Sequence, residues 1–510
     1  MPETRLVVPD RVPALAGWEN LAEREERAGI HPGSPILLSP DHRIDEALST
    51  FLCRSSFARL APTTKEDYTE DYCLFFDFLW SRGKVWNEAT ADDLWDFEEW
   101  RTRSPRNPAT VGGARWNRGL AALARLYRWA EKSGHMAASP VTTRLITTRH
   151  GEVVESAEAR AKDARSSDVH WLTPRAFRQW VDVGLRGYGA DGLPSSRWSG
   201  RLEDRNVAFA ETLFASGMRL TEGASLLTFE VPQARLAAGR YCVGRLAQQV
   251  TKSKRGRTFY VATSVVGGIE SYVESTRAAA VGRAQAKGRY ENLPVWRLVT
   301  GVSGRREKVV NWRDQDGVVG RKPLSQLTVS ERMLLFTEGP AGPEPLWLWL
   351  NESGLPLQPH SWEGVFQAAS KRCEVILSPD GQGESPFCTP HMCRHSFALH
   401  MLVVLHHVVD LRMGLSPEER RDFRMLYGDP WRMVQDLLGH RDIETTRGIY
   451  LAPVSDLQLR ALLAEPAPLG EGGGEEVSQA RVTALLARIA QESEGIQDID
   501  GKLAPTLVSA

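Results

Sequence analysis

The run TPHMCRHSFALHM, residues 389–401, contains three histidines, an arginine and a cysteine. The Thr-Pro pair at its start suits the N-cap and the first position of a helix. A helix that begins there places His391, Arg394 and His395 on one face, because residues three and four apart are neighbours on a helix surface. The unpaired amide groups of a helix N-terminus also attract anions. The run therefore predicts a site that binds a phosphate or another anion.

Two other interpretations of this run are a zinc site and an ordinary helix whose polar side chains are hydrogen-bonded. A zinc site would use His391, Cys393, His395 or His400. Cys393 lies off the face that His391 and His395 share, and no distant pair of ligands has a spacing typical of zinc sites. We therefore expect no metal. The choice between an anion site and an ordinary helix depends on the rest of the chain.

Three further runs contain residues suited to the same chemistry. ASGMRLTEGASLL places Arg219 and Glu222 at a junction between two helical segments. TKSKRGR places Lys252 and Lys254 in a turn between predicted strands. LLGHRDIETTRGIY, residues 437–450, has a histidine directly after a glycine and ends on a tyrosine. Side chains of these types can bind a phosphodiester, move protons and supply a nucleophile.

In these runs the chain resembles the tyrosine recombinase (phage integrase) family. That family forms one active site from an Arg in a G-x-R-x-x-E run, a hairpin Lys, an H-x-x-R-H run, an L-G-H run and a later Tyr. The matching residues occur here in the same order, and they are Arg219 with Glu222, Lys252, His391 with Arg394 and His395, His440, and Tyr450. Each motif alone is weak, whereas all of them in order are specific. One departure is that the interval from His440 to Tyr450 is one residue longer than is usual in the family.

The resemblance implies a phosphate site made by two arginines. Guanidinium groups stay charged at any physiological pH and present forked donors that fit a phosphate. Arg219 and Arg394 would take this role, and His440 would add a further hydrogen bond to the phosphate. Glu222 and His395 would support these residues from behind. Neither a metal ion nor a cofactor is implied.

The remaining residues would move protons and form a covalent intermediate. The phenol of Tyr450 has an ordinary pKa of about 10 and needs a base, and His391 is the candidate because an imidazole titrates near neutral pH. Lys252 would give a proton to the departing 5′-oxygen, with Lys254 as the alternative. Tyr450 would then be linked to the 3′-phosphate. A 5′-hydroxyl of a second DNA can attack that linkage, so strands are exchanged without ATP.

The residues before these runs predict a helical domain over residues 42–150. Aromatic residues at helical spacing predict a helix that begins at Thr63 or Thr64 and stops at Gly83. Thr90 and Asp93 are placed for the capping box of a second helix. The resemblance implies that these helices are the family's core-binding (SAM-like) domain.

A third helix, ARWNRGLAALARLYRWAEKSG, buries one arc of apolar residues and carries arginines on the opposite arc. These arginines are Arg115, Arg118, Arg125 and Arg128. A stripe of this kind is either a solvated helix surface or a contact with DNA phosphates. The resemblance makes it a candidate DNA-binding surface.

The second half of the chain predicts an α+β catalytic domain over residues 171–465. Residues 151–170 are polar and unpatterned, so we expect a linker there. Alternating β-forming residues around the TKSKRGR turn predict two or three strands, and SWEGVFQAASKRC predicts a helix. Residues 283–345 and 402–432 give few signals and are treated as insertions. The predicted fold class is mainly α with a small β-sheet.

The two ends of the chain differ from the rest in composition. Residues 1–41 are rich in proline and charge and predict an N-terminal arm, and residues 466–510 form an acidic tail. Within the tail, ARVTALLARIA is amphipathic and either docks on a neighbouring subunit or stays unstructured. Six cysteines without a CxxC pair suit a reducing compartment, and no run of about 18 apolar residues occurs. We expect a cytoplasmic protein that does not enter a membrane.

The net charge of −1 does not by itself indicate a nucleic-acid-binding protein, so the functional expectation depends on the resemblance. The resemblance implies a site-specific DNA recombinase or integrase that integrates or excises a mobile element. It also implies a homotetramer on two DNA sites, with an accessory directionality factor as a further partner. The alternative is a type IB topoisomerase-like enzyme, which uses the same residue types to relax DNA. The helical N-terminal domain and the H-x-x-R-H run favour the recombinase.

Overall fold

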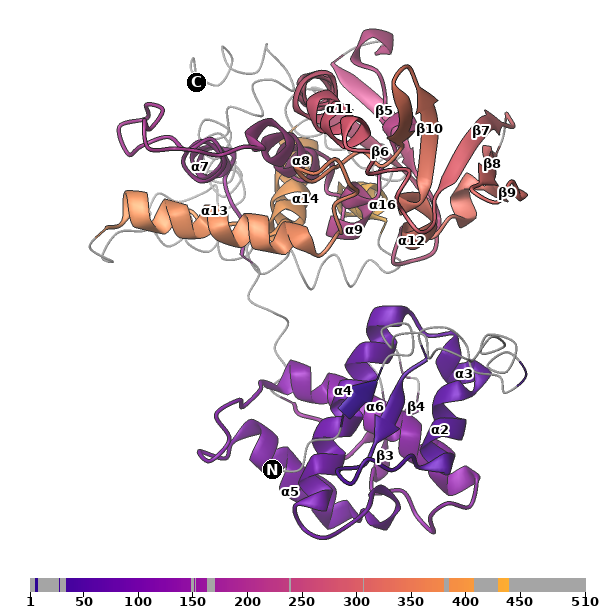
Figure 1. Ribbon diagram of the computed structural model, residues 1–510. Coiled ribbons are helices and arrows are strands. Elements are labelled where there is room, and N and C mark those ends of the chain that lie inside the picture. Colours follow the sequence, from indigo (N-terminus) through magenta and orange to yellow (C-terminus); the bar gives the residue numbers. More distant parts are fainter. Residues whose placement is uncertain are drawn as a thin grey trace, which may run out of the picture. The chain divides into compact units, whose positions relative to one another are not determined.

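The computed structural model describes residues 5–7, 27, 34–147, 151, 153–162, 170–237, 240–305, 307–379, 385–407 and 430–439. The chain divides into two compact units, Met1–Ser167 and Asp168–Ala510, which are shown in Figure 1. Across these residues the fold is mostly helical with small sheets, which confirms the predicted fold class. Among the described helices, none has both the length and the apolar character that crossing a bilayer requires.

The first unit is a helical domain with two small antiparallel sheets, β1 with β2 and β3 with β4. Its elements are β1 (Arg5–Val7), β2 (Ile36–Leu38), α2 (Glu46–Cys53), α3 (Ser55–Ala58), α4 (Pro62–Trp80), η2 (Trp86–Glu88), α5 (Ala91–Thr102), α6 (Gly113–Lys132), β3 (Thr143–Thr147) and β4 (Val153–Ala157). One aromatic-rich core joins α2, α4, α5 and α6.

The helix starts of this unit follow local rules. α4 begins at Pro62, slightly before the predicted Thr63 or Thr64, because proline fits the first helical turn, where no amide donor is needed. The predicted capping box of α5 is confirmed. The Thr90 hydroxyl accepts from the Asp93 amide at 3.3 Å, and the Asp93 carboxylate accepts from the Thr90 amide at 2.9 Å.

Part of the predicted linker belongs to the first unit. β4 lies inside residues 151–170 and pairs with β3 along its whole length. The chain then packs on α6, where Trp116 Nε1 donates to the Ala159 carbonyl at 2.7 Å and Asn117 exchanges two hydrogen bonds with Ala161. Part of the predicted N-terminal arm is also folded, since Leu37 in β2 is buried. These strands are only three to five residues long, too short to show a clear alternation in the sequence.

The second unit is an α+β domain. Its elements are α7 (Pro174–Trp180), η3 (Val181–Leu185), α8 (Glu203–Ser216), α9 (Leu220–Ala224), η4 (Thr228–Glu230), η5 (Ala234–Leu236), β5 (Tyr241–Leu246), β6 (Arg257–Ala262), α10 (Thr263–Tyr272), η6 (Val273–Arg277), α11 (Ala278–Ala286), β7 (Arg297–Ser303), β8 (Val309–Asp314), β9 (Val319–Pro323), η7 (Leu324–Gln326), α12 (Val329–Met333), β10 (Leu335–Gly339), β11 (Gly342–Pro345), α13 (Ser361–Leu377), α14 (Pro390–His407) and α16 (Pro430–Leu438).

Helix α8 lies in the core of this unit, with α13 and α14 close by (Figure 1). Phe209 of α8 stacks on Trp362 of α13 with ring centroids 3.6 Å apart, and Trp349 meets both rings edge-on. Stacked and edge-on aromatic pairs contribute about 0.5–1.5 kcal/mol beyond burial of their area. This core holds the C-terminal end of α8 in a fixed position, and that end forms one side of the site described below.

The region 283–345, which the sequence analysis left without elements, contains five strands. They form one sheet in the order β11-β10-β7-β8-β9, in which β7 and β10 are parallel and the other neighbours are antiparallel. Val310 at the centre of β8 is fully buried. The strands are short and contain arginine and glycine, and a β-bulge interrupts β7 after Val299. Their alternation is therefore too weak to predict strands from the sequence.

Candidate active site

The junction between α8 and α9 is fixed by Gly217, as the sequence predicted. Gly217 caps α8 in the left-handed conformation, with φ of 62°, which glycine adopts without strain. A Cβ atom at this position would lie 2.3 Å from Cδ1 of Phe397 in α14. Arg219 follows as the N-cap residue of α9. The sharp turn therefore brings Arg219 close to α14.

Glu222 organises the arginines behind this turn. Its side chain is 1% exposed and accepts from the Arg219 amide at 3.0 Å, from Arg219 Nη1 at 3.0 Å and from Arg257 Nη2 at 2.8 Å. Burial by itself raises the pKa of this carboxyl, but the guanidinium groups of Arg257, Arg394 and Arg219 outweigh burial and lower the pKa overall. Glu222 is therefore ionised and orients two arginines at once.

Arg394 of α14 forms hydrogen bonds with the α8–α9 turn and with the end of α16. This helix begins at Pro390, and Thr389 caps it by accepting from the Met392 amide at 3.2 Å, as predicted. Arg394 is 1% exposed, and it donates from Nη1 to the Gly217 carbonyl at 2.6 Å and from Nη2 to the Leu438 carbonyl at 2.7 Å. One buried cation thus joins the α8–α9 turn to the end of α16.

Arg257 is a site residue that the sequence analysis missed. Besides its bond to Glu222, it donates from Nη1 to the Leu437 carbonyl at 2.6 Å. Gly439 has φ of 65°, and a Cβ atom there would lie 2.7 Å from Cδ of Arg257. Arg257 and Arg394 together fix the end of α16 at Leu438, and Gly439 and His440 follow in the sequence. Arg257 is the last residue of the TKSKRGR run, and no neighbouring residue in the sequence indicates that its side chain is buried.

Lys252 and Lys254 occupy different environments in the turn between β5 and β6. Lys254 has φ of 53° and donates from Nζ to the carbonyl oxygen of Gln249 at 3.0 Å and to its side-chain oxygen at 2.8 Å. Lys252 is exposed, and its charge acts on His391 of α14. The ammonium group of Lys254 is engaged within its own turn, whereas the charge of Lys252 contributes to the lowered pKa of His391.

His391 and His395 are adjacent on α14, as predicted. Their ring centroids are 4.3 Å apart at an interplanar angle of 80°. Partial loss of hydration, followed by the positive charges of Arg394, Arg219 and Lys252, lowers the pKa of His391. His395 is buried, and burial with the neighbouring His391 lowers its pKa to about 3. Both rings are therefore neutral at physiological pH.

Replacing Arg257 by methionine is expected to slow any reaction at this site by about 10²-fold, because loss of its two hydrogen bonds lets Glu222 and the end of α16 shift. Removing one partner of the buried pair should also lower the free energy of unfolding by about 3–5 kcal/mol. Arg277→Met is the control, since the Arg277 side chain is 2% exposed, against 9% for Arg257, and pairs with Glu344 at 2.6 Å outside the site.

Urea unfolding and single-turnover rates should be measured on both variants. The Arg277 variant should lose stability while keeping its rate. An Arg257 variant that keeps the wild-type rate under folding conditions would show that Arg257 has only a structural role. Arg257→Lys should recover part of the rate, because an ammonium group can pair with Glu222 but cannot donate in a fork.

Two buried histidines, His395 and His400, predict that the free energy of unfolding falls at acidic pH. Burial lowers the pKa of His400 to about 4, although a backbone hydrogen bond with Leu172 opposes this, and the pKa of His395 is about 3. The unfolded chain takes up protons below pH 6.5 that the folded chain does not. Each histidine should therefore remove about 1.4 kcal/mol of stability per pH unit below about 6.5. Urea unfolding between about pH 7 and about pH 5 would measure this slope, and His400→Phe should make it shallower. An unchanged slope in that variant would contradict the prediction.

The cysteine of the opening run lies away from the histidines. Cys393 is fully buried, with its Sγ 3.6 Å from Sγ of Cys388. Within the described ranges, no group of three or more His, Cys, Asp or Glu side chains is arranged to hold a metal ion.

Several of the predicted α6 arginines form contacts within the first unit. The predicted arc is buried, and it consists of Trp116, Leu120, Leu123, Leu126, Tyr127 and Ala130. Arg118 and Arg128 are exposed on the other side, where Arg118 pairs with Asp67 at 3.4 Å. Arg115 pairs with the buried Asp71, and Arg125 donates to the Ser56 carbonyl. Arg115 and Arg125 therefore contribute to holding the domain together, which the helical wheel alone did not predict.

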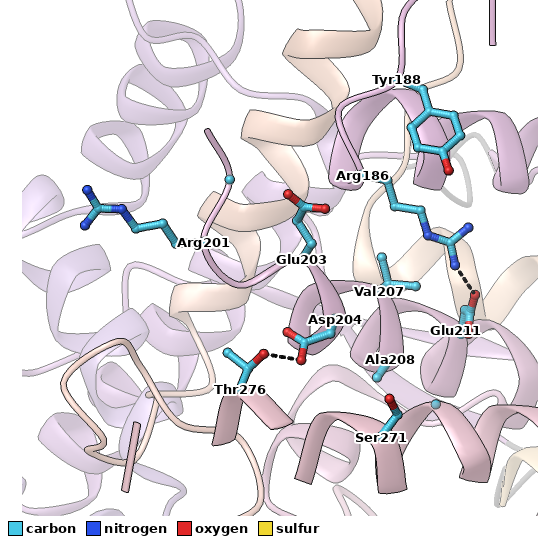
Figure 2. A pocket seen from close by; sticks show the side chains of 12 residues that line it. Arg186, Tyr188, Arg201, Glu203, Asp204, Val207, Ala208, Glu211, Ser271 and Thr276 are labelled. Atoms are coloured by element: carbon cyan, nitrogen blue, oxygen red, sulfur yellow. Dashed lines mark hydrogen bonds and ion pairs between the residues drawn. The ribbon is translucent and has the colours of Figure 1, made fainter. Parts of the chain in front are cut away.

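A hollow of about 510 Å³ lies beside the N-terminal half of α8 (Figure 2). Arg186 pairs there with Glu211 at 3.7 Å, and Thr276 donates to Asp204. Burial raises the pKa of Glu211, although the charge of Arg186 opposes this. No predicted site residue lines this hollow. Arg201, which also lines it, pairs with Glu352 at 3.6 Å.

Several predicted residues and segments lie outside the described residues. These are His440, Tyr450, the whole acidic tail and most of the 402–432 insertion. The structure thus brings together Arg219, Glu222, Lys252, His391, Arg394 and His395, and it leads the chain from Leu438 and Gly439 directly toward His440.

Comparison with known proteins identifies the first unit. Residues 56–134, which include α4, α5 and α6, match the family model described as phage integrase, N-terminal SAM-like domain. The predicted SAM-like domain and the resemblance to phage integrases are confirmed by this match. No curated protein is similar enough in sequence to match the chain.

Solved structures similar to the chain include DNA-bound recombinases and integrases. The XerH site-specific recombinase bound to palindromic difH substrate, a post-cleavage complex, shares 12% identity at a TM-score of 0.44, over 87% of this chain and 90% of that chain. The Tn1549 transposon integrase in complex with transposon right end DNA shares 11% identity at a TM-score of 0.41, over 80% and 95%. A lambda integrase dimer bound to a COC' core site shares 11% at 0.38, over 78% and 73%.

Proposed function

We propose that this chain is a site-specific tyrosine recombinase that integrates or excises a mobile element by cutting and rejoining DNA strands. The observation that supports the proposal most is that Arg219 and Arg394, taken from distant parts of the chain, converge around the buried Glu222, and that both arginines act on His391 of α14. The SAM-like domain supports it independently. The coarser conclusion, a protein with an integrase-type DNA-binding domain, does not depend on these roles.

The phosphate would bind at the two arginines. Arg219 is 26% exposed, so its guanidinium remains accessible while Glu222 fixes its orientation. Arg394 is locked by two backbone carbonyls, so its charge needs no rearrangement when negative charge develops on the phosphate oxygens. His440 would add a third donor from the end of α16.

His391 and Lys252 would move the protons. A lowered pKa keeps the His391 imidazole neutral at pH 7, which is the form that accepts a proton from a tyrosine hydroxyl. Lys252 would give a proton to the 5′-oxygen as it leaves, and the engagement of Lys254 with Gln249 supports this choice between the two lysines.

Tyr450 would attack the phosphorus and become linked to the 3′-phosphate, releasing a 5′-hydroxyl. One phosphodiester replaces another, so the bond energy is kept for the reverse step. A 5′-hydroxyl from a second DNA site then attacks the phosphotyrosine and restores a continuous strand. Exchange between two sites would require a tetramer, in which each subunit acts on one strand.

The proposal is tested by trapping the covalent intermediate. A pool of duplexes with a nick close to the cleaved bond lets the short fragment diffuse away, so rejoining fails and the adduct accumulates. Peptide mass spectrometry of the adduct should place the DNA on Tyr450. An adduct on another residue, or none, would contradict the proposal. Relaxation of supercoils by a monomer that never joins two DNA sites would favour the topoisomerase alternative.

A further inference from the structure

The inserted sheet of the second unit carries a concentration of positive charge. Residues 297–323 contain seven basic residues and three acidic ones, in a chain whose net charge is −1. Strands β7, β8 and β9 make up most of this segment and lie side by side at one edge of the unit (Figure 1). The positive charges are divided between the two faces of the sheet.

The inner face of these strands uses its cations within the fold. On β8, Val310 is fully buried, and Trp312 points to the same face because alternate residues share a face. Arg297 lies over the Trp312 ring at 5.0 Å, and Lys322 pairs with Glu331 at 2.8 Å. Arg297 and Lys322 are therefore engaged in contacts within the second unit.

The outer face presents a different set of side chains. Asn311 and Arg313 point outward from β8, and Arg321 of β9 lies directly opposite Asn311. Arg313 and Arg321 are both exposed. They are diagonal neighbours across the strand pair, with side chains that start about 7–8 Å apart. Arg305 and Lys308, in the turn from β7 to β8, are exposed as well.

The segment directly after β9 is hydrogen-bonded to the turn that contains Lys252. The Gln249 amide in that turn donates to the carbonyl of Ser325 at 2.9 Å, and Ser325 lies in η7, directly after β9. The Leu324 amide donates to the Lys308 carbonyl at 2.8 Å, which ties β9 to the start of β8. The basic sheet and the turn of the candidate general acid are therefore held together as neighbours.

We propose that the outer face of β7, β8 and β9 is a second DNA-contacting surface, which binds backbone phosphates of the duplex beside the cleaved bond. The inference rests on the proposed function, because that function places a DNA phosphate next to Lys252. The partner is DNA because two guanidinium groups on an open sheet face match the regular charge of a duplex backbone. Such contacts position the duplex without reading its sequence.

The test is the salt dependence of binding to duplex DNA of mixed sequence. Arg313→Ala combined with Arg321→Ala should lower the affinity about tenfold or more near 0.1 M salt and reduce the slope of log K against log salt by about 1–2, because two phosphate contacts are lost. The matched control combines Arg283→Ala with Lys287→Ala on α11. It removes the same charge from exposed positions on another element.

Each outcome separates the inference from the proposed function. A reduced slope in the sheet variant alone supports the inference, and it does so even if no Tyr450 adduct ever forms. A wild-type slope in the sheet variant, in a protein that forms the adduct, overturns the inference and leaves the function standing. Equal losses in both variants would mean that net charge alone acts, which also overturns the assignment to this face.

Discussion

Replacing Arg394 by alanine is expected to slow DNA cleavage by about 10²–10³-fold, the effect of removing one preorganised donor to a developing oxyanion. The substitution removes the guanidinium group that donates to both the Gly217 carbonyl and the Leu438 carbonyl. Arg219 and His440 follow those two carbonyls by two residues each. We therefore expect the substitution to remove a positive charge at the phosphate and also to change the distance between Arg219 and His440. The affinity for DNA should change little.

The same substitution should destabilise the fold, and a control must separate the two effects. Two buried carbonyls would lose their donors, at a cost of about 1–3 kcal/mol each. Arg332→Ala is the matched variant, because Arg332 is also 1% exposed and donates to the Ser225 carbonyl and to Glu230. Both variants should unfold at lower urea concentration, but only the Arg394 variant should lose cleavage.

Single-turnover cleavage with enzyme in excess measures the chemical step, and titration of labelled duplex measures affinity. Comparable losses in cleavage and in affinity would make Arg394 a binding residue only. An equal loss of cleavage in the Arg332 variant would show that general instability explains the effect.

Replacing Tyr450 by phenylalanine is expected to remove the covalent adduct entirely, a fall of roughly 10⁴-fold or more in strand cleavage. Phenylalanine lacks the nucleophilic oxygen and otherwise has nearly the same shape. The hydroxyl carries no charge at neutral pH, so binding to duplex DNA should stay as in the wild type. Tyr450 lies outside the described residues, so this experiment supplies information that the structure does not.

Adduct formation on the nicked duplexes should be followed by denaturing gel. Tyr260→Phe is the control, since Tyr260 in β6 is a tyrosine that is 45% exposed and has no role in the proposed reaction. It should form the adduct at the wild-type rate. Persistence of the adduct in the Tyr450 variant would identify another nucleophile and contradict the proposed mechanism.

The sequence alone determined those features that neighbouring residues control. The capping box at Thr90 and Asp93, the Thr389 cap of α14 and the break at Gly217 all depend on contacts within a few positions along the chain. The buried arc of α6 follows from the helical period. The resemblance supplied the long-range information that spacing lacks, and it led to the expectation that Arg219 and Arg394 lie in one site, although it gave no sign of Arg257.

Only the tertiary structure decided which of several chemically equivalent side chains occupy the site. Arg257 reaches the Leu437 carbonyl across 180 positions of sequence, and nothing near it in the chain predicts that contact. Lys252 and Lys254 differ only in how their turn folds, and Arg115 pairs with the buried Asp71 whereas Arg118 pairs with the more exposed Asp67. Long-range packing determines burial and pairing, and burial and pairing determine whether a cation supports the fold or remains free to bind a phosphate.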